Sequence, residues 1–205
     1  MESFSEPELN IKLCSVYLNL GITYIYLNNY NISEKFLRKA LSQTEGMLGS
    51  EVISKLNSDI YENLGIIKEV NNNCTEAIQY YKKSLKLKFN FYGELNEEVL
   101  DLQYKIAGAY VLSKKYKDAE EILISLTDVI SNEKLKAKNA NIDNYYRYGS
   151  YFYTTGVTLL KLGKNRIAKQ YLTKAEVLWK EILSNKDPVL QTIYSMIKLC
   201  EKPKV

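Results

Sequence analysis

Apolar residues recur at steps of three and four along most of the chain, and short polar turns interrupt them. In the first such segment Leu13, Tyr17, Leu20, Tyr24 and Leu27 follow the helical period. The same pattern predicts nine helices. They cover residues 7–28, 32–48, 52–70, 75–91, 97–112, 116–130, 145–162, 165–183 and 188–199. The sequence therefore predicts an all-α chain of antiparallel helix pairs, with the last helix left over as a cap.

Small residues repeat in a fixed register across these pairs. A glycine or alanine lies in the first helix of each pair, and a second small residue follows twelve positions later. These pairs are Gly21/Ser33, Gly65/Ala77, Ala107/Ala119 and Gly156/Ala168, and Ala40, Ser84, Leu126 and Ala175 follow seven positions further on. Glycine inside a helix costs up to about 1 kcal/mol relative to alanine. We therefore expect the two helices of each pair to cross closely at these points, with the small residues as matching contacts.

Together with neighbouring aliphatic and aromatic residues, this register resembles the tetratricopeptide repeat. The first copy has Leu20-Gly21, Tyr24, Tyr30, Ser33, Leu37 and Ala40; the second has Leu64-Gly65, Ala77, Tyr81 and Ser84; the third has Ile106-Ala107, Tyr110, Tyr116, Ala119 and Leu123; and the fourth has Gly156, Ala168, Leu172 and Ala175. The period of about 42 residues resembles the subtype found in kinesin light chains, longer than the usual period of about 34. Among the departures, Lys68 and Leu159 replace the aromatic residue of the first helix, and Cys74 and Asn165 replace the tyrosine of the turn.

The resemblance implies a right-handed α-solenoid, a superhelix of antiparallel helix pairs with a C-terminal capping helix. The whole chain, 1–205, is then a single array. Its repeats cover residues 7–49, 52–93, 97–131 and 145–184, with an irregular linker or helix extension at 132–144 and the capping helix at 187–200.

The resemblance also implies a concave groove lined by the first helices. The residues at groove positions are Asn19, Ile22, Tyr26, Glu62, Asn63, Ile66, Tyr104, Lys105, Tyr153 and Thr154. In peptide-binding members of the family, asparagines two residues before the small residue hold the ligand backbone. Asn19 and Asn63 match that position, whereas Lys105 and Thr154 do not. The sequence leaves open whether the two asparagines form a peptide clamp or are ordinary polar residues on a solvated wall.

The residue inventory argues against catalysis. The chain contains no histidine, which removes His-based acid–base chemistry and nearly all zinc sites. Neither GxxxxGK[ST] nor GxGxxG occurs, so phosphate and dinucleotide cradles have no support. The three cysteines lack metal-binding spacing, and Cys14 and Cys74 fall at positions expected inside a helix pair. We expect no enzyme, no cofactor and no catalytic or metal site.

Charge and hydropathy add little that is specific. The formal net charge is +4, and the lysine clusters at 82–88, 114–117 and 134–138 are interpreted as solvated outer helix faces rather than a nucleic-acid surface. No apolar run is long enough to cross a bilayer, so no direct membrane insertion is expected, and the first residues lack the pattern of a signal peptide. We expect a cytoplasmic protein, and a mitochondrial location stays open if a targeting segment is missing from the sequence.

The expected function is that of a non-enzymatic interaction module, a scaffold or adaptor that binds a peptide or helix of a partner protein in the groove. Two alternatives remain. One is a structural subunit or assembly factor of a larger complex, resembling mitochondrial members of the family. The other is a peptide-sensing regulatory domain, resembling bacterial receptors with similar repeats. The partner and the oligomeric state are left open.

Overall fold

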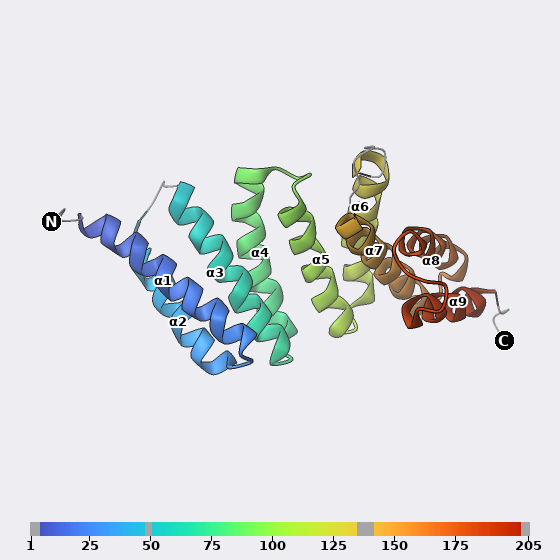
Figure 1. Cartoon of the computed structure of the whole chain (residues 1–205), viewed down its shortest axis with the longest axis horizontal. Coiled ribbons are helices and arrows are strands. Elements are labelled where there is room, and N and C mark those ends of the chain that lie inside the picture. The colour runs from blue at the N-terminus through green and yellow to red at the C-terminus, as the bar shows by residue number, and fades with distance from the viewer. Residues whose placement is uncertain (1–4, 48–50, 135–141, 202–205) are drawn as a thin grey trace. The chain divides into compact units, whose positions relative to one another are not determined.

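The computed structural model describes residues 5–47, 51–134 and 142–201. Within these ranges the chain forms α-helices, one short π-helix and no strand (Figure 1). The chain divides into two compact units, the first ending at Ala109 and the second beginning at Tyr110. The all-α fold predicted from the periodicity is confirmed.

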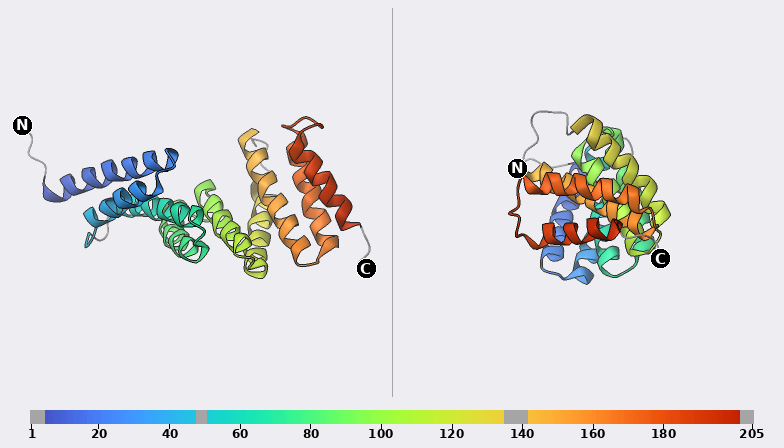
Figure 2. Two further views of the ribbon diagram at one scale, coloured as in Figure 1. Left: turned by 90° about the horizontal axis from the view of Figure 1, so that it is seen from below. Right: turned by 90° about the vertical axis from the view of Figure 1, so that its right-hand side faces the viewer.

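Unit 1 contains two complete helix pairs and most of a fifth helix. Its helices are α1 (Glu6–Tyr26), α2 (Tyr30–Gln43), α3 (Glu51–Val70), α4 (Cys74–Tyr92) and α5 (Glu97–Leu112), of which α5 extends past the unit boundary. Helix α1 packs on α2 and α3 packs on α4, and α3 also contacts α1 and α2. Figure 2 shows these helices from two further directions.

Unit 2 contains α6 (Tyr116–Val129), the π-helix Ile130–Lys134, α7 (Ile142–Lys161), α8 (Asn165–Lys180) and α9 (Pro188–Cys200). Helices α7 and α8 form a pair, and α6 packs on α7. Helix α9 packs mainly on α8, as expected for a C-terminal capping helix.

One predicted helix boundary needs correction. The second helix does not reach residue 48, because α2 ends at Gln43, where the Thr44 hydroxyl donates a hydrogen bond to the Leu41 carbonyl at 3.0 Å and Gly46 adopts a φ of 76°. The predicted stop at Gly49 lies outside the described residues. The segment 132–144 is helical at both ends, since the π-helix runs to Lys134 and α7 begins at Ile142, and residues 135–141 lie outside the described ranges.

The turns within the helix pairs share one conformation. A residue seven positions after the small residue of each first helix has a left-handed backbone. These residues are Asn28, Asn72, Lys114 and Gly163, with φ values of 56°, 59°, 60° and 72°. Asparagine and glycine tolerate this region best. The next asparagine then caps the second helix, because the side chains of Asn29 and Asn73 accept hydrogen bonds from the Ile32 and Glu76 amides.

The small residues of the first helices lie directly under large buried side chains of the second helices. A Cβ atom added at Gly21 would lie 2.6 Å from Leu37 Cδ2, and one added at Gly156 would lie 2.6 Å from Leu172 Cγ. At Gly65 the obstacle is the ring of Tyr81. The expected close crossing is therefore present, and a large residue sixteen positions after each of these glycines packs over it.

The small residue twelve positions on contacts the crossing point, as expected. At Ser33 the hydroxyl donates a hydrogen bond to the Gly21 carbonyl at 2.7 Å, which ties the two helices together at the crossing. At Ala168 it is the backbone carbonyl that approaches the added Cβ of Gly156, at 3.2 Å. Both residues are fully buried. Their small size lets the second backbone come close, while the large residue one turn later fills the space over the glycine.

Unit 2 contains a second close approach that the repeat pattern does not reveal. The indole of Trp179 lies against Gly149, where a Cβ atom would collide with it, and its Nε1 donates a hydrogen bond to the Tyr146 carbonyl at 3.0 Å. The single tryptophan of the chain thereby joins α8 to the first half of α7.

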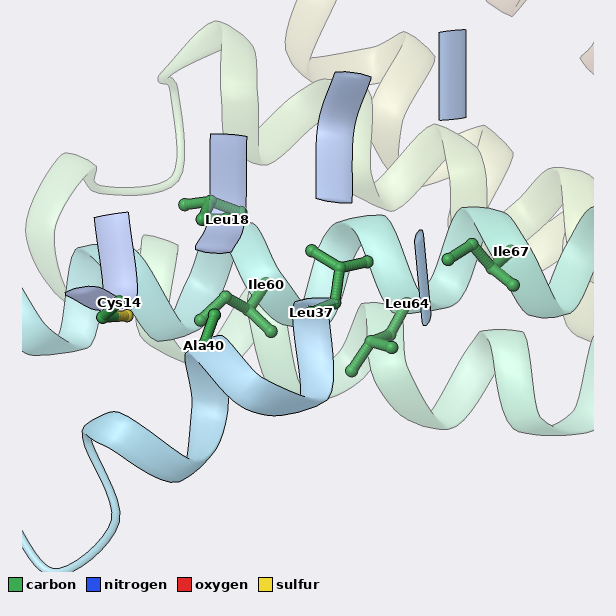
Figure 3. Packing of buried hydrophobic residues seen from close by; sticks show 7 residues of the cluster. All are labelled: Cys14, Leu18, Leu37, Ala40, Ile60, Leu64 and Ile67. Carbon is green, nitrogen blue, oxygen red and sulfur yellow. The ribbon is translucent and has the colours of Figure 1, made fainter. Parts of the chain in front are cut away.

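The core of unit 1 lies where the first pair meets α3. Figure 3 shows its buried members, which come from α1, α2 and α3: Cys14, Leu18, Leu37, Ala40, Ile60, Leu64 and Ile67. Burial raises the pKa of the Cys14 thiol to about 11, so Cys14 is an unreactive core residue. Cys74, also expected inside a pair, is only half-buried at the start of α4.

An ion pair explains one departure from the repeat pattern. Lys68 stands in α3 where an aromatic residue is usual, and its ammonium contacts Glu34 of α2 at 3.0 Å and Glu76 of α4 at 3.4 Å. Its hydrogen bond to Glu34 raises the pKa of Lys68 despite partial burial. The lysine therefore links both second helices of unit 1 to α3, where an aromatic ring would only fill space.

Both units repeat one arrangement of two rings and a lysine. An aromatic residue of the first helix stacks on one of the second helix, and a lysine ammonium lies 5.3–5.8 Å from both ring centres. The three groups are Tyr17/Phe36/Lys39, Tyr61/Tyr80/Lys83 and Phe152/Tyr171/Lys174. The third repeat has Gln103, Ile122 and Ser125 at these positions. Such contacts shield the seam between paired helices from water and add to its stability.

We predict that Gly65→Ala lowers the free energy of unfolding by roughly 1–3 kcal/mol, because the added methyl group overpacks against the buried Tyr81 ring. Gly108→Ala is the matched control. Gly108 is also inside a helix of unit 1, but an added Cβ meets nothing within 4 Å, so helix propensity favours alanine by up to about 1 kcal/mol. Urea denaturation, followed by circular dichroism, measures the free energy of unfolding of both variants. Equal effects of the two substitutions would contradict the close crossing.

Candidate protein-interaction surface

Eight of the ten sequence-predicted groove residues belong to unit 1, where α1, α3 and α5 supply them. On α1, Asn19 and Tyr26 are exposed, and Tyr26 has 82% of its surface in solvent. Ile22 lies between them in sequence but is half-buried against the core. Residues seven positions apart on a helix share a face, so Asn19 and Tyr26 present an amide and a phenol on one side of α1.

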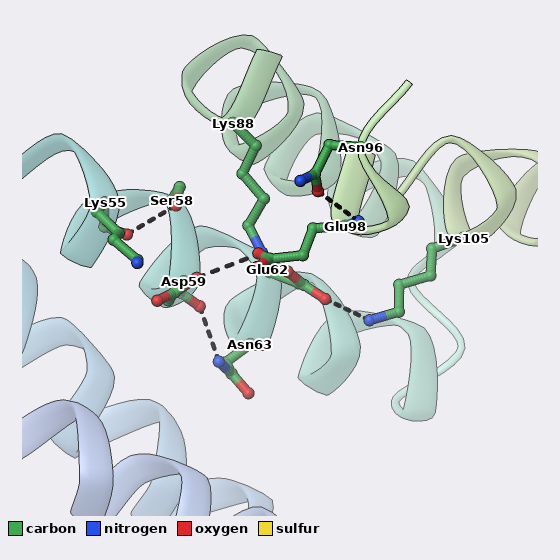
Figure 4. A network of polar contacts seen from close by, with 9 residues as sticks. All are labelled: Lys55, Ser58, Asp59, Glu62, Asn63, Lys88, Asn96, Glu98 and Lys105. Carbon is green, nitrogen blue, oxygen red and sulfur yellow. Dashed lines mark hydrogen bonds and ion pairs between the residues drawn. The ribbon is translucent and has the colours of Figure 1, made fainter. Parts of the chain in front are cut away.

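A charged network joins α3, α4 and α5 (Figure 4). At its centre is Lys88 of α4, which is 4% exposed. Its ammonium lies 2.7 Å from Glu62 Oε2, 2.8 Å from Glu98 Oε2 and 3.3 Å from Asp59 Oδ1. The other oxygen of Glu62 accepts a hydrogen bond from the Lys105 ammonium. Glu62 and Lys105, both predicted groove residues, are therefore bonded to each other across α3 and α5.

The pKa values of this network follow from burial and pairing. Burial by itself lowers the pKa of Lys88, but the neighbouring Glu62 and Glu98 carboxylates and Asp59 outweigh it and hold the pKa of Lys88 above its usual range. Burial alone would raise the pKa of Glu62, but the positive charges of Lys105 and Lys88 outweigh the effect of burial. The pKa of Glu62 is therefore lower than its usual value of 4.5. At Asp59 burial dominates over Lys88 and raises the pKa. Pairing thus favours the charged forms of Glu62 and Lys88, whereas burial disfavours the charged form of Asp59.

Asn63, the second clamp candidate, is partly engaged within its own helix. Its side-chain amide donates a hydrogen bond to the Asp59 carbonyl at 2.8 Å. Ile66, one turn after Glu62, and Tyr104, next to Lys105, are half-buried. The first helices of unit 1 thus present exposed groups on α1 and more deeply packed, ion-paired groups on α3 and α5.

The other two predicted residues, Tyr153 and Thr154, lie on α7 in unit 2. The ring of Tyr153 packs on Trp179 of the paired helix, with 5.6 Å between ring centres, and burial raises the pKa of its phenol. The hydroxyl of Thr158 donates to the Thr154 carbonyl at 2.8 Å. The ring of Tyr153, a predicted groove residue, therefore packs inside the helix pair.

Sequence reasoning missed Lys88, Asp59 and Glu98. Lys88 belongs to a lysine-rich run that was interpreted as solvated, and this interpretation is wrong for Lys88. The signal was present, because Ala77, Tyr81, Ser84 and Lys88 follow one another at steps of four, three and four on the buried face of α4. A lysine on a buried face requires carboxylate partners.

The described residues also bear on other kinds of site. A cavity of about 350 Å³ lies between the end of α2 and α3, lined by Arg38, Leu41, Ser42, Thr44, Glu45, Asn57 and Tyr61, and none of the predicted groove residues borders it. The described residues contain no group of three or more His, Cys, Asp or Glu side chains arranged to hold a metal ion. None of the described helices has both the length and the apolarity that crossing a bilayer demands.

Two segments of the chain match family models described as tetratricopeptide repeat, over residues 13–51 and 58–91. These segments cover the helix pairs of unit 1. A search of the curated proteins found no match.

Several solved structures share the fold. A putative kinesin light chain from Podosopora anserina with nearly identical TPR-like repeats is 13% identical, with a TM-score of 0.71 over 97% of this chain and 87% of that one. BtubC (BKLC) from P. vanneervenii is 14% identical, with a TM-score of 0.66 over 96% and 84%. The apo form of RapI is 14% identical, with a TM-score of 0.74 over 92% and 62%.

We predict that Lys88→Met lowers the free energy of unfolding by about 3 kcal/mol, because it leaves the partly buried Glu62 and Asp59 carboxylates without the buried ammonium that they share. Lys86→Met, at an exposed position of the same helix, should change it by no more than about 0.5 kcal/mol. Denaturant titrations of both variants and the wild type provide the comparison.

The stability of the wild type and of Lys88→Met, measured as a function of pH, tests the electrostatic contribution of the network. Because the pKa of Glu62 is lowered in the folded chain, its stabilising contribution is present above 4.5 and is lost as the pH falls through the folded value. Acidification therefore removes from the wild type a stabilising interaction that Lys88→Met already lacks. We expect the difference between them to narrow below pH 4.5, and a constant difference would show that Lys88 acts through packing alone.

Proposed function

Because this chain is a tetratricopeptide-repeat protein with the fold of kinesin-light-chain-like repeats, we propose that it binds a peptide or helix of a partner protein along the first helices of unit 1. Repeat proteins of this family serve as protein–protein interaction scaffolds and are generally not enzymes. The surface proposed here consists of Asn19, Ile22 and Tyr26 of α1, Glu62, Asn63 and Ile66 of α3, and Tyr104 and Lys105 of α5.

The exposure of Tyr26 carries this proposal. A tyrosine ring with 82% of its surface in water has no packing role, and it lies on the same face of α1 as the exposed amide of Asn19. Tyrosine is among the residues that most often anchor protein interfaces, since it buries a large ring while its hydroxyl still finds a partner. Asparagine can donate to and accept from a peptide backbone at once.

The ion pairs behind this surface support it by fixing its geometry. Glu62 binds both Lys88 and Lys105, so α3 and α5 are held side by side before any ligand arrives. A surface that is already ordered loses less conformational entropy on binding. Lys105 also keeps part of its side chain in solvent and offers a cation at the edge of the surface.

Affinity capture tests the proposal. The tagged wild type and the double variant Asn19→Ala/Tyr26→Ala are used to capture partners from cells that produce the chain naturally, with quantitative mass spectrometry as the readout. We predict that the double variant recovers at least about tenfold less of the main partner, because it lacks two side chains that anchor the interface. The matched control is Gln79→Ala/Phe89→Ala, which removes an exposed amide and an exposed ring from α4. Equal recovery by both double variants would reject this surface.

A further inference from the structure

A second face of α1, continued by the C-cap residue Leu27, is mostly apolar and regularly spaced, and the described residues leave it largely exposed. Its residues are Leu9, Leu13, Val16, Leu20, Thr23 and Leu27, at alternating steps of four and three, and we call them the outer seam. Leu9, Val16 and Leu27 are 48%, 52% and 66% exposed, Thr23 is exposed, and the remaining two leucines are half-buried. This alternation is the spacing with which helices pack side by side in coiled coils.

The next repeat shows what normally covers such a face. The residues 44 positions after Leu9, Val16 and Thr23 are Ile53, Ile60 and Ile67 of α3. They are 7%, 0% and 0% exposed, and Ile60 and Ile67 belong to the core formed with α1 and α2. The equivalent face in the second repeat is thus buried by helices of the first. The outer seam has the same character, and the described residues of unit 1 leave it largely open to solvent.

Helix α9 of unit 2 differs from α1 in the character of its exposed positions. Its exposed positions are mostly polar, with Gln191, Thr192, Ser195 and Lys198 among them. Stacked repeats need such a polar outer face on their terminal elements to stay soluble. The exposed positions of the outer seam are apolar apart from Thr23, whereas those of α9 are mostly polar.

We propose that the outer seam binds the outer seam of a second copy of this chain, with the two α1 helices antiparallel. The steps of four, three, four, three and four read the same in both directions, so an antiparallel copy can match all six positions at once. Leu9 then meets Leu27 of the second copy, Leu13 meets Thr23, and Val16 meets Leu20. A surface that complements itself in this way closes into a two-fold symmetric dimer.

The charges along α1 allow this pairing. Between Leu9 and Leu27 the chain carries one charged residue, Lys12, and the antiparallel arrangement places it opposite Tyr24 of the second copy. Glu8 comes opposite Asn28, so no like charges face each other. The antiparallel arrangement also brings opposite ends of the two helix dipoles together.

The size of the contact predicts a reversible dimer. A helix of 21 residues is about 30 Å long, and one helix face buries less area than a standard stable interface. Association should therefore depend on protein concentration in the micromolar range.

Sedimentation equilibrium of the full chain over a range of concentrations tests the proposal. We expect the wild type to dimerise and Val16→Glu to raise the dissociation constant by roughly tenfold or more, because each dimer would bury two carboxylates in an apolar seam. Val177→Glu is the matched control, since Val177 of α8 is a valine of nearly equal exposure, 56%, and should leave the constant unchanged. Unchanged circular dichroism melting of Val16→Glu would show that it still folds.

Disulfide trapping tests the antiparallel orientation. Leu9→Cys and Leu27→Cys are made as separate variants, each with Cys74→Ser and Cys200→Ser to remove the other accessible thiols. Within one chain the two positions are roughly 27 Å apart. We expect a covalent dimer on oxidation only when the two variants are mixed. Covalent dimers of either variant alone would indicate parallel helices and overturn the arrangement.

Two results would overturn the proposal as a whole. One is a wild type that stays monomeric up to about 1 mM, which leaves the outer seam to an unlike partner. The other is a dimer that Val16→Glu and Val177→Glu weaken equally. Neither result bears on the capture experiment with Asn19→Ala/Tyr26→Ala, so the two proposals fail separately.

Discussion

The close approach of paired helices is the constraint on which the packing and the charged network of unit 1 depend. The ring of Tyr81 lies directly on the backbone at Gly65 and fixes which face of α4 turns inward. Lys88 is seven residues further along α4 and therefore shares the inward face. Its ammonium must find anionic partners there, and Asp59, Glu62 and Glu98 provide them. One steric contact thus leads to the charged network that holds α5 against α3.

The network contributes specificity more than net stability. Moving ions out of water costs several kcal/mol each, so a buried ion pair often stabilises a fold no more than apolar packing of the same volume. Lys88 has contacts in α3 and α5, and Glu62 binds cations from α4 and α5. Another register of α5 would leave at least one of these charges buried without a partner. The network therefore selects the arrangement of the three helices that keeps Glu62 and Lys105 on the proposed binding surface.

The sequence predicts those features that repeat and misses those that occur once. Helix pairs, turns and crossing points recur at fixed spacing, so weak local signals add up: Gly21, Gly65 and Gly156 could each be an accident alone but not together. The contact of Gly149 with Trp179 occurs once and has no second copy to reveal it. Lys88 lies among exposed lysines in the sequence, and only its helical phase with Ala77, Tyr81 and Ser84 distinguishes it from them. The stacking of Tyr153 on Trp179 depends on a rotamer choice between two helices, which no spacing rule encodes.

The two surfaces proposed on α1 can be occupied together. At 100° per residue, Asn19 is turned by about 60° from Val16 around the helix axis, and Tyr26 is turned by about 80°. A helix packed on the outer seam therefore covers Leu9, Val16 and Leu27 but approaches the proposed binding surface only from its edge. A dimer would then present two peptide-binding surfaces, one from each copy. Partners with two binding segments would gain from the second site through effective concentration, so self-association and peptide binding reinforce each other instead of competing.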